Sequence, residues 1–512
     1  MRRPPLPSTL RQRGRHLAAT GAVLALLTLG AGPLSAQVAQ AEFAARRAAL
    51  LDALPDGVVL VLGNSEPNPD YIPFHQHPHF FYLTGFDEPG GALVMVKQGA
   101  SRRTILFVRG RNPAQEVWNG ARLGVDGVRS TMGIEGRDAT GLRTVVDSLL
   151  ATSRTLHVLG DIGARMTERS VHDQVVDAVA QANAGVTVDS RAASRAILQL
   201  RGRKSIAELE RIRIASEISA RGHLAAFRLV QPGIGEFELQ AAAEGAWRAE
   251  GADGPSYGTI VGSGPNSTTL HYNRNDRTAQ AGEVIVMDMA AYFDNYAADI
   301  TRTVPVSGRF TKEQRDVYTI VLDAHKAAER QIRVDGPARA MTDSSNAVLA
   351  AGLTALGLIE SPTATYDCGS ADQPRSCPQM GLYYMHGLGH GIGLLVHDPD
   401  QYTTTGKFAV GSAFTIEPGV YVRGNLLDII TDTPRNREMK ARIGAAVRRY
   451  ADIGVRIEDD YLVTANGVLR PSAIVPREID EVEKVLAEPR TRRDPAVVER
   501  YRRFKSGRQQ AP

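Results

Sequence analysis

The chain has 512 residues, of which 43% are hydrophobic and 23% charged, a length and balance typical of a globular protein with several domains. The formal net charge is +4, but the excess of Lys and Arg lies at the two ends, so residues 37–488 are net acidic and a nucleic-acid partner is not expected. Two cysteines, Cys368 and Cys377, are too few for a Cys₄ zinc site or a disulfide-stapled miniature fold.

Residues 1–36 have the order of features of a secretory signal peptide. Five arginines without an acid precede an apolar run from Leu17 to Ala31, and small residues follow to Ala36. The run is shorter than the ~20 residues of a membrane span, which argues against an uncleaved anchor. Its compactness argues against a transit peptide. We therefore predict cleavage, no stable membrane insertion afterwards, and an exported protein, periplasmic or secreted.

Export would place the two cysteines in an oxidising compartment. Cys368 and Cys377 lie nine residues apart in a loop-like segment, where they either close a small local disulfide or remain free thiols. At the other end of the chain, residues 481–512 are rich in Arg and are predicted to form a basic, solvated tail.

Residues 37–200 alternate short β-rich runs with helical stretches and are predicted to form an α/β domain. Strands are expected at 58–62, 92–96 and 104–108, and helices at 41–53 and 138–152.

Residues 201–480 are predicted to form a second domain that mixes strands and helices in the α+β manner. Near its start, Ser205 and Glu208 form a capping box that opens an amphipathic helix ending at about residue 230. Further strands are expected at 259–262, 284–288, 298–306, 414–417 and 455–464, and further helices at 313–334, 341–356 and, as an insertion, 435–450.

Two short patterns resemble known sites but lack their context. Residues 254–258 match the Gly-x-Ser-x-Gly motif of serine hydrolases, in which a strand precedes the serine and a helix follows it. Around Ser256 the predicted order is reversed, which argues against a serine nucleophile. His75, His77 and His79 have the spacing of a metal cluster, but no set of carboxylates lies nearby, so we interpret them as structural or substrate-edge residues.

Two aspartates lie on neighbouring strands of the second domain. If the turn at Asp294-Asn295 is a two-residue hairpin loop, Asp288 lies opposite Thr301, and Asp299 lies diagonally on the same face at ~7–8 Å between backbones. Two carboxylates at that distance can share a pair of metal ions. A register shift of one residue would point them to opposite faces, so the prediction depends on the turn.

Residues 386–393 alternate glycine with larger residues. As a strand, this segment has one bare face and one face that bears His386 and His390, and a bare backbone suits close approach by a ligand or metal. A helix with four glycines would lose roughly 1 kcal/mol at each of them. Together with His397, three histidines beside this segment predict a site.

Two further carboxylates complete the candidate set. Glu417 ends an apolar strand at Pro418-Gly419, and Glu458 shares a strand face with Arg456. Four carboxylates and an imidazole without thiolate suit two borderline-hard divalent ions, Mn²⁺ in the first place, with Zn²⁺ or Co²⁺ as alternatives. Such ions ~3.5–4 Å apart hold a bridging water and lower its pKa.

Taken together, these residues resemble the metal-dependent proline peptidases of the pita-bread fold, the superfamily of creatinase, aminopeptidase P, prolidase and methionine aminopeptidase. The local sequences that carry the resemblance include Asp-Ile-Thr-Arg-Thr at 299–303 and Glu-Pro-Gly at 417–419. The resemblance implies metal ligands at Asp288, Asp299, His390, Glu417 and Glu458, and substrate-contacting histidines at His271, His386 and His397. It also implies that Glu417 manages a proton and that Arg456 orients a ligand carboxylate.

The segment Tyr-Leu-Thr-Gly-Phe-Asp-Glu-Pro at 82–89 is similar to a signature of the aminopeptidase P N-terminal domain. The resemblance, which covers about residues 40–470, implies an N-terminal creatinase-like α/β domain followed by a C-terminal pita-bread metallopeptidase domain. Gly391 and Leu395 depart from the pattern, because aminopeptidase P often has a bulky residue at the first position and Asp at the second.

The function implied is that of an Xaa-Pro aminopeptidase, which removes the N-terminal residue from peptides with proline at position two. Relatives of this kind commonly form homodimers or homotetramers. Three alternatives stay open at this point: a prolidase restricted to Xaa-Pro dipeptides, a metal-free binding module on the same fold, and a serine hydrolase.

Overall fold

The structure is a computed structural model that describes residues 38–69, 72–163, 169–370, 372–373 and 375–488. The predicted leader, 1–36, lies outside the described residues, as does most of the predicted tail. Helix α15 (Ile479–Leu486) buries Val482 and Leu486, so the first residues of that tail are folded. None of the helices within the described ranges has the length and apolar character needed to cross a membrane.

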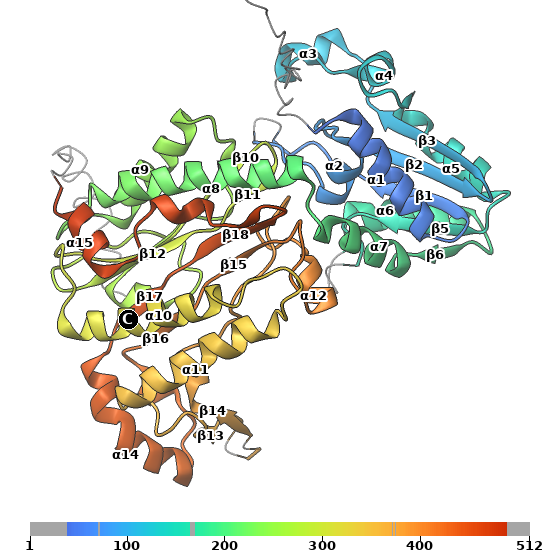
Figure 1. Ribbon diagram of the computed structural model, residues 1–512. Helices are drawn as coiled ribbons and strands as arrows, with labels where there is room; N and C mark the ends of the chain where they lie inside the picture. The colour runs from blue at the N-terminus through green and yellow to red at the C-terminus, as the bar shows by residue number, and fades with distance from the viewer. Residues whose placement is uncertain (1–37, 70–71, 164–168, 371, 374, 489–512) are drawn as a thin grey trace, which may run out of the picture. The chain divides into compact units, whose positions relative to one another are not determined.

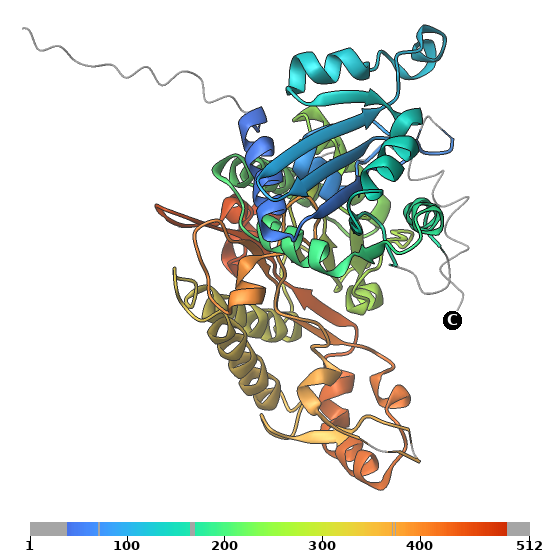
Figure 2. The same cartoon turned by 90° about the vertical axis from the view of Figure 1, so that its right-hand side faces the viewer.

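A six-stranded mixed sheet forms the centre of the N-terminal part (Figures 1 and 2). Its strand order is β4-β3-β2-β1-β5-β6, with antiparallel pairing in β1–β2 and β2–β3 and parallel pairing in the other pairs. The three strands predicted from the sequence are confirmed as β1, β2 and β3. The strand bounds are β1 (Gly57–Leu62), β2 (Ala92–Gln98), β3 (Ser101–Val108), β4 (Glu135–Asp138), β5 (Thr155–Leu159) and β6 (Thr187–Asp189).

Helices cover both faces of this sheet. Val59 and Val61 of β1 pack with one group of helices and Val58 and Leu60 with the other. Because alternate residues point to opposite faces, a strand covered on both sides is apolar throughout, as β1 is. The first group is α1 (Gln40–Ala53), α2 (Pro78–Thr84) and α7 (Arg191–Gly202), the second is α5 (Leu142–Leu150) and α6 (Val171–Ala182), and the short helices α3 (Pro113–Asn119) and α4 (Gly124–Gly127) follow β3.

The second part begins with the predicted capping box. The Ser205 hydroxyl accepts a hydrogen bond from the Glu208 amide, the Glu208 carboxylate accepts one from the Ser205 amide, and α8 (Ile206–Phe227) follows. In Figure 1, α8 and α9 (Glu236–Ala249) lie on one side of a layer of strands, and α10 (Lys312–Glu329) and α11 (Arg339–Ala355) lie on the other. This is the pita-bread arrangement that the resemblance implies, so the predicted fold class is confirmed.

The strands of this layer form small antiparallel sheets. Their orders are β12-β9-β8, β15-β18-β19, β16-β17 and β11-β10-β7. The bounds are β7 (Gly254–Pro255), β8 (Ile260–Ser263), β9 (Val284–Asp288), β10 (Ala291–Phe293), β11 (Tyr296–Ala297), β12 (Thr301–Pro305), β15 (Ala413–Ile416), β16 (Gly419–Val422), β17 (Ile453–Arg456), β18 (Asp459–Thr464) and β19 (Gly467–Leu469).

The hairpin that carries the two aspartates has the predicted register. Asp294 and Asn295 form its two-residue turn with φ of 47° and 68°, the left-handed conformation of a type I′ turn. Asp288 pairs with Thr301, as expected. The strand predicted at 298–306 is shorter than expected, because β12 begins only at Thr301.

The single strand predicted at 455–464 is wrong. The chain changes partner at Ile457 and Glu458, because β17 pairs with β16 whereas β18 pairs with β15. At this break the Glu458 backbone pairs instead with Thr301, with N–O distances of 3.0 and 3.4 Å. A strand pattern in the sequence does not reveal such a change of partner, because both halves are extended and buried.

Cys368 and Cys377 form a disulfide with a Cα–Cα distance of 5.7 Å, which settles the alternative left open by the sequence. It joins β13 (Thr365–Asp367) to β14 (Ser376–Pro378), and this hairpin lies beside the predicted insertion helix, α14 (Pro434–Arg449) (Figure 1). The Asn436 side chain hydrogen-bonds both the amide and the carbonyl of Asp367. The remaining α-helices of the described residues are the short helices α12 (Gln401–Thr405) and α13 (Leu426–Ile429).

Candidate metal centre

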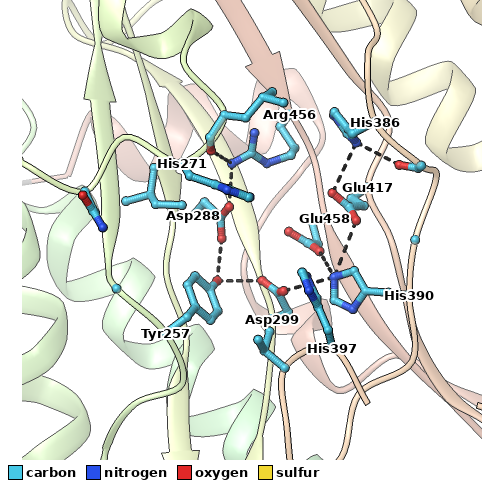
Figure 3. Close-up of a pocket in the computed structure, with 17 residues that line it drawn as sticks. Tyr257, His271, Asp288, Asp299, His386, His390, His397, Glu417, Arg456 and Glu458 are labelled. Atoms are coloured by element: carbon cyan, nitrogen blue, oxygen red, sulfur yellow. Dashed lines mark hydrogen bonds and ion pairs between the residues drawn. The ribbon is translucent and has the colours of Figure 1, made fainter. Parts of the chain in front are cut away.

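A cavity of about 610 Å³ in the C-terminal part brings together all nine residues predicted to form the site (Figure 3). They come from strands, turns and loops that are far apart in the sequence. Tyr257 joins them, a residue whose role at the site the sequence did not reveal. The nine are His271, Asp288, Asp299, His386, His390, His397, Glu417, Arg456 and Glu458.

The two aspartates of the hairpin converge, as the register requires. The Tyr257 hydroxyl lies 2.5 Å from Asp288 Oδ1 and 2.6 Å from Asp299 Oδ1. A phenol has one proton, so it donates to only one carboxylate at a time. The carboxylate that does not receive this proton therefore depends on another donor or on a cation.

On the opposite side of the cavity, the His390 imidazole faces three carboxylates. Its Nε2 lies 3.4 Å from Asp299 Oδ2, 3.5 Å from Glu417 Oε1 and 3.9 Å from Glu458 Oε1. Ligand atoms of Asp299, His390 and Glu458 all lie within 4.8 Å of one another, as in a metal site.

Glu458 carries the clearest sign of a missing partner. Its Oε2 accepts a hydrogen bond from Thr301 Oγ1 at 2.7 Å, but its Oε1 is buried without any hydrogen bond. An unpaired buried carboxylate oxygen is costly, and a cation bound by Glu458, Asp299 and His390 would remove that cost. The residues present thus fit a divalent metal ion.

The shifted pKa values of the site residues also favour a bound cation. Burial raises the pKa of Glu417 to about 8 and raises the pKa of Asp288 and Glu458 above their ordinary values, and neighbouring carboxylates add to each shift. Burial alone would lower the pKa of His390, but Asp299 and Glu417 raise it to about 9. If all four carboxylates were ionised, they would carry more negative charge than Arg456 and one imidazole offset, and bound cations would remove this excess.

Arg456 holds the first aspartate in place. Its Nη2 donates to Asp288 Oδ2 at 2.5 Å and its Nη1 donates to the Tyr421 hydroxyl at 2.8 Å. The Tyr421 hydroxyl lies 2.8 Å from His386 Nε2, and His386 Nδ1 lies 2.8 Å from the Gly387 carbonyl. Because a carbonyl only accepts, Nδ1 carries the proton and Nε2 accepts from Tyr421. Burial and Arg456 lower the pKa of His386 to about 4, so its imidazole is neutral at pH 7.

The predicted strand at 386–393 is wrong, although its histidines reach the cavity. The segment is irregular and runs beside β15 with separate backbone bonds: the Glu417 amide donates to Leu388 O, the Thr415 amide to His390 O and the Ile392 amide to Ala413 O, at 2.7–3.0 Å. The ladder is interrupted at His390, whose amide donates to the Thr415 hydroxyl at 3.2 Å. The chain then turns back at 391–398, where Gly391 pairs with Asp398. His397 thereby comes to lie against His390, with ring centroids 4.2 Å apart.

The two patterns discounted in the sequence stay outside the site. The Ser256 hydroxyl donates to the Ala291 carbonyl at 2.7 Å, a framework contact. His77 packs against His172, and His79 accepts a hydrogen bond from Arg201. In the part of the chain that the structure describes, these histidines do not form a metal-binding group.

Comparisons with known proteins agree with this geometry. The profile of metallopeptidase family M24 matches residues 210–465, and that of the aminopeptidase P N-terminal domain matches residues 43–158. The chain therefore belongs to metallopeptidase family M24, whose members use divalent metal ions.

Relatives of known name extend the match to nearly the whole chain. The chain is 31% identical over 458 residues to the Xaa-Pro aminopeptidase of Haemophilus influenzae, covering 88% of this chain and 98% of that protein. Among solved structures, aminopeptidase P from E. coli in its low-pH form is similar, with a TM-score of 0.74 and 28% identity over 89% of this chain and all of that one. An aminopeptidase of Pseudomonas aeruginosa matches with a TM-score of 0.74 and 29% identity, over 88% of this chain and 99% of that one.

Proposed function

We propose that this protein is a dinuclear metal-dependent Xaa-Pro aminopeptidase, which removes the N-terminal residue from peptides whose second residue is proline. The observation that carries the proposal is the cavity in which all nine residues meet and in which Glu458 Oε1 lacks a partner. Relatives over nearly the whole chain are named Xaa-Pro aminopeptidase, which favours this activity over a dipeptide-restricted prolidase.

The proposed cofactor is a pair of divalent ions, Mn²⁺ with Zn²⁺ or Co²⁺ as alternatives. The residues that would hold it are Asp288, Asp299, His390, Glu417 and Glu458. When bound, the ions polarise the attacked carbonyl and lower the pKa of water.

The remaining chemistry belongs to side chains of this chain. Glu417, which lines the cavity beside His390, accepts the proton of the attacking water and returns it to the proline nitrogen that leaves. His271, His386 and His397 line the cavity and contact the substrate or the oxyanion of the tetrahedral intermediate. Arg456 fixes the orientation of Asp288.

Hydrolysis of defined peptides tests the proposal. Metal-reconstituted protein should release the first residue from Xaa-Pro-Xaa tripeptides and longer peptides, and should leave matched Xaa-Ala peptides intact. Glu417→Ala should abolish turnover while the protein stays folded. Cleavage of Xaa-Pro dipeptides alone would indicate a prolidase, and an active Glu417→Ala variant would refute the assigned role of Glu417.

We further propose that the protein is exported and that it assembles as a homodimer or homotetramer. The leader-like residues 1–36 and the Cys368–Cys377 disulfide support export. Cell fractionation with and without residues 1–36 tests the location, and sedimentation of the purified protein tests the assembly.

A further inference from the structure

The loop that carries His397 is closed by a buried group of charges that the proposed reaction does not use. Asp398, directly after His397, forms ion pairs with Arg201 Nη2 and, at 3.2 Å, with Lys204 Nζ. The Asp398 and Arg201 side chains are each 2% exposed and the Lys204 side chain 1%. Arg201 Nη1 also donates to His79 Nδ1 at 2.9 Å. We call Asp398, Arg201, Lys204 and His79 the Asp398 cluster.

The cluster connects the N-terminal sheet to the cavity. His79 lies on α2 and Arg201 lies in the last turn of α7, and both helices pack on that sheet. Lys204 also donates to the Pro399 carbonyl, so the chain on the far side of Asp398 is held as well. Arg201 and Lys204, which are distant in sequence from the site, thus bind the carboxylate next to His397, and His79 accepts a hydrogen bond from Arg201.

Two glycines make room for this carboxylate. A Cβ atom on Gly391 would lie 2.3 Å from the Asp398 carbonyl oxygen, and one on Gly393 would lie 2.4 Å from Asp398 Oδ2. A side chain at either position would therefore displace the backbone or the carboxylate of Asp398. Asp398 is thus what approaches the glycine-rich segment closely at Gly391 and Gly393.

The closed loop fixes two histidines at once. The Asp398 amide donates to the Gly391 carbonyl at 2.8 Å, which brings together the residues that directly follow His390 and His397. The two imidazoles then pack edge to face, with centroids 4.2 Å apart and an interplanar angle of 66°. His390 also faces the carboxylates of the cavity, whereas the described contact of the His397 ring is with His390.

We propose that Asp398 is a positioning residue, which through Arg201 and Lys204 sets the His397 imidazole against the substrate. This inference rests on the proposed function, because it assigns His397 a part in that reaction. A misplacement of ~1 Å can lower a rate ~100-fold, so a small shift of this loop is sufficient for a measurable loss.

Asp398→Asn tests the inference, because it keeps the shape of the side chain and removes its charge. We expect kcat on an Xaa-Pro-Xaa peptide to fall ~10–100-fold with little change in KM and in bound metal. In a His397→Ala background the same substitution should lower kcat almost no further, because both substitutions remove the same contribution, that of the His397 imidazole. Additive losses would overturn the proposal.

Glu208→Gln is the matched control. Glu208 forms an equally buried ion pair with Arg46, at 3.0 Å, and neither residue lines the cavity. The Glu208→Gln variant should be destabilised as the Asp398→Asn variant is, but its kcat should not change. Should Asp398→Asn fail to fold, Arg201→Lys replaces it, because a lysine keeps the charge but cannot contact Asp398 and His79 together.

A structural readout separates this inference from the proposed function. In histidine-labelled protein with Zn²⁺ added, the His397 ring resonance, assigned by its loss in His397→Ala, should shift in Asp398→Asn and stay in place in Glu208→Gln. An unmoved His397 resonance in Asp398→Asn would overturn the positioning role. Absence of hydrolysis by the unsubstituted protein would count against the proposed function alone, and the resonance would still decide this inference.

Discussion

The two sides of the cavity are built in different ways. On one side, Asp288 and Asp299 lie on a β-hairpin whose turn and register follow from a few neighbouring residues. On the other side, His386, His390 and His397 lie on an irregular segment whose path is set by β15 and by the Asp398 cluster. The comparison teaches that a local element places the two aspartates, while contacts from distant segments place the imidazoles.

Arg302, on strand β12 of the hairpin, connects the hairpin to the core. All five of its N–H donors are used: they reach the carbonyls of Thr301, Glu458, Val475 and Pro476 and, at 2.6 Å, the Asp459 carboxylate. The backbone of Glu458 is thus held by a fully buried ion pair. The imidazole side depends on backbone bonds to residues 413–417 and on the ion pairs of Asp398 with Arg201 and Lys204.

Loss of a hairpin carboxylate should have the largest effect. Asp299→Ala removes a group that faces both Tyr257 and His390, so we expect kcat/KM on an Xaa-Pro-Xaa peptide to fall by at least ~10³-fold together with the metal content. Elemental analysis and kinetics on the same sample test this. A variant that keeps metal and turnover would show that the hairpin does not hold the ions.

The buried ion pair under the hairpin should dominate stability. Burial alone would raise the pKa of Asp459, but Arg302 and neighbouring cationic groups hold it well below its usual range. Its stabilisation is therefore complete above the unfolded pKa of ~3.9 and is lost as pH falls through the lower folded value. Asp459→Asn should cost about 3–5 kcal/mol in the free energy of unfolding at pH 7.

Denaturant titration at pH 7 measures that cost. Asp480, whose side chain is 97% exposed, provides the control, and Asp480→Asn should stay within about 0.5 kcal/mol of the unsubstituted protein. Equal effects of the two substitutions would contradict the account of Arg302 and Asp459.

Tyr257→Phe should have an intermediate effect. It removes the hydroxyl shared by Asp288 and Asp299 but leaves both carboxylates in place, so metal affinity or kcat should fall ~10–100-fold. Metal titration followed by peptide hydrolysis measures both quantities. No change in either would mean that the strands alone orient the aspartates.

The smallest expected effect concerns a histidine behind the hairpin. His223 Nε2 donates to the Met289 and Ile300 carbonyls, and burial lowers its pKa to about 3. Below pH ~6.5 the unfolded chain binds a proton at this histidine and the folded chain does not, so stability falls as pH falls, until the folded pKa is reached.

Between pH 7.5 and 5.5, this histidine should contribute a loss of about 1.4 kcal/mol in the free energy of unfolding. In His223→Gln that part of the pH dependence should disappear, whereas substitution of the exposed His75 by Gln should leave it in place. An unchanged pH dependence in His223→Gln would contradict the predicted protonation state.

The hairpin side was predictable from the sequence because its determinants are local. The Asp294-Asn295 turn fixes the register, and the register fixes which face each aspartate occupies. The capping box at Ser205 and strands β1, β2 and β3 of the N-terminal sheet were predictable for the same reason.

The imidazole side was only partly predictable. Alternation of glycine with larger residues suggested a strand, but the close contacts along it come from different segments. A Cβ atom on Gly389 would meet the Thr415 carbonyl, and one on Gly391 or Gly393 would meet Asp398, which Arg201 and Lys204 bind from nearly two hundred residues earlier. The role of Tyr257 was equally hidden, since nothing in its neighbours marks a tyrosine that reaches two carboxylates. Both features arise from contacts between distant segments, which local patterns do not encode.

The most direct test is hydrolysis of an Xaa-Pro-Xaa tripeptide by the purified protein, with metal content measured on the same sample before and after chelation. We predict about two divalent ions per chain, release of the first residue, loss of activity on chelation and recovery with Mn²⁺. Activity that survives complete removal of metal, or that a serine-directed reagent abolishes, would contradict the account.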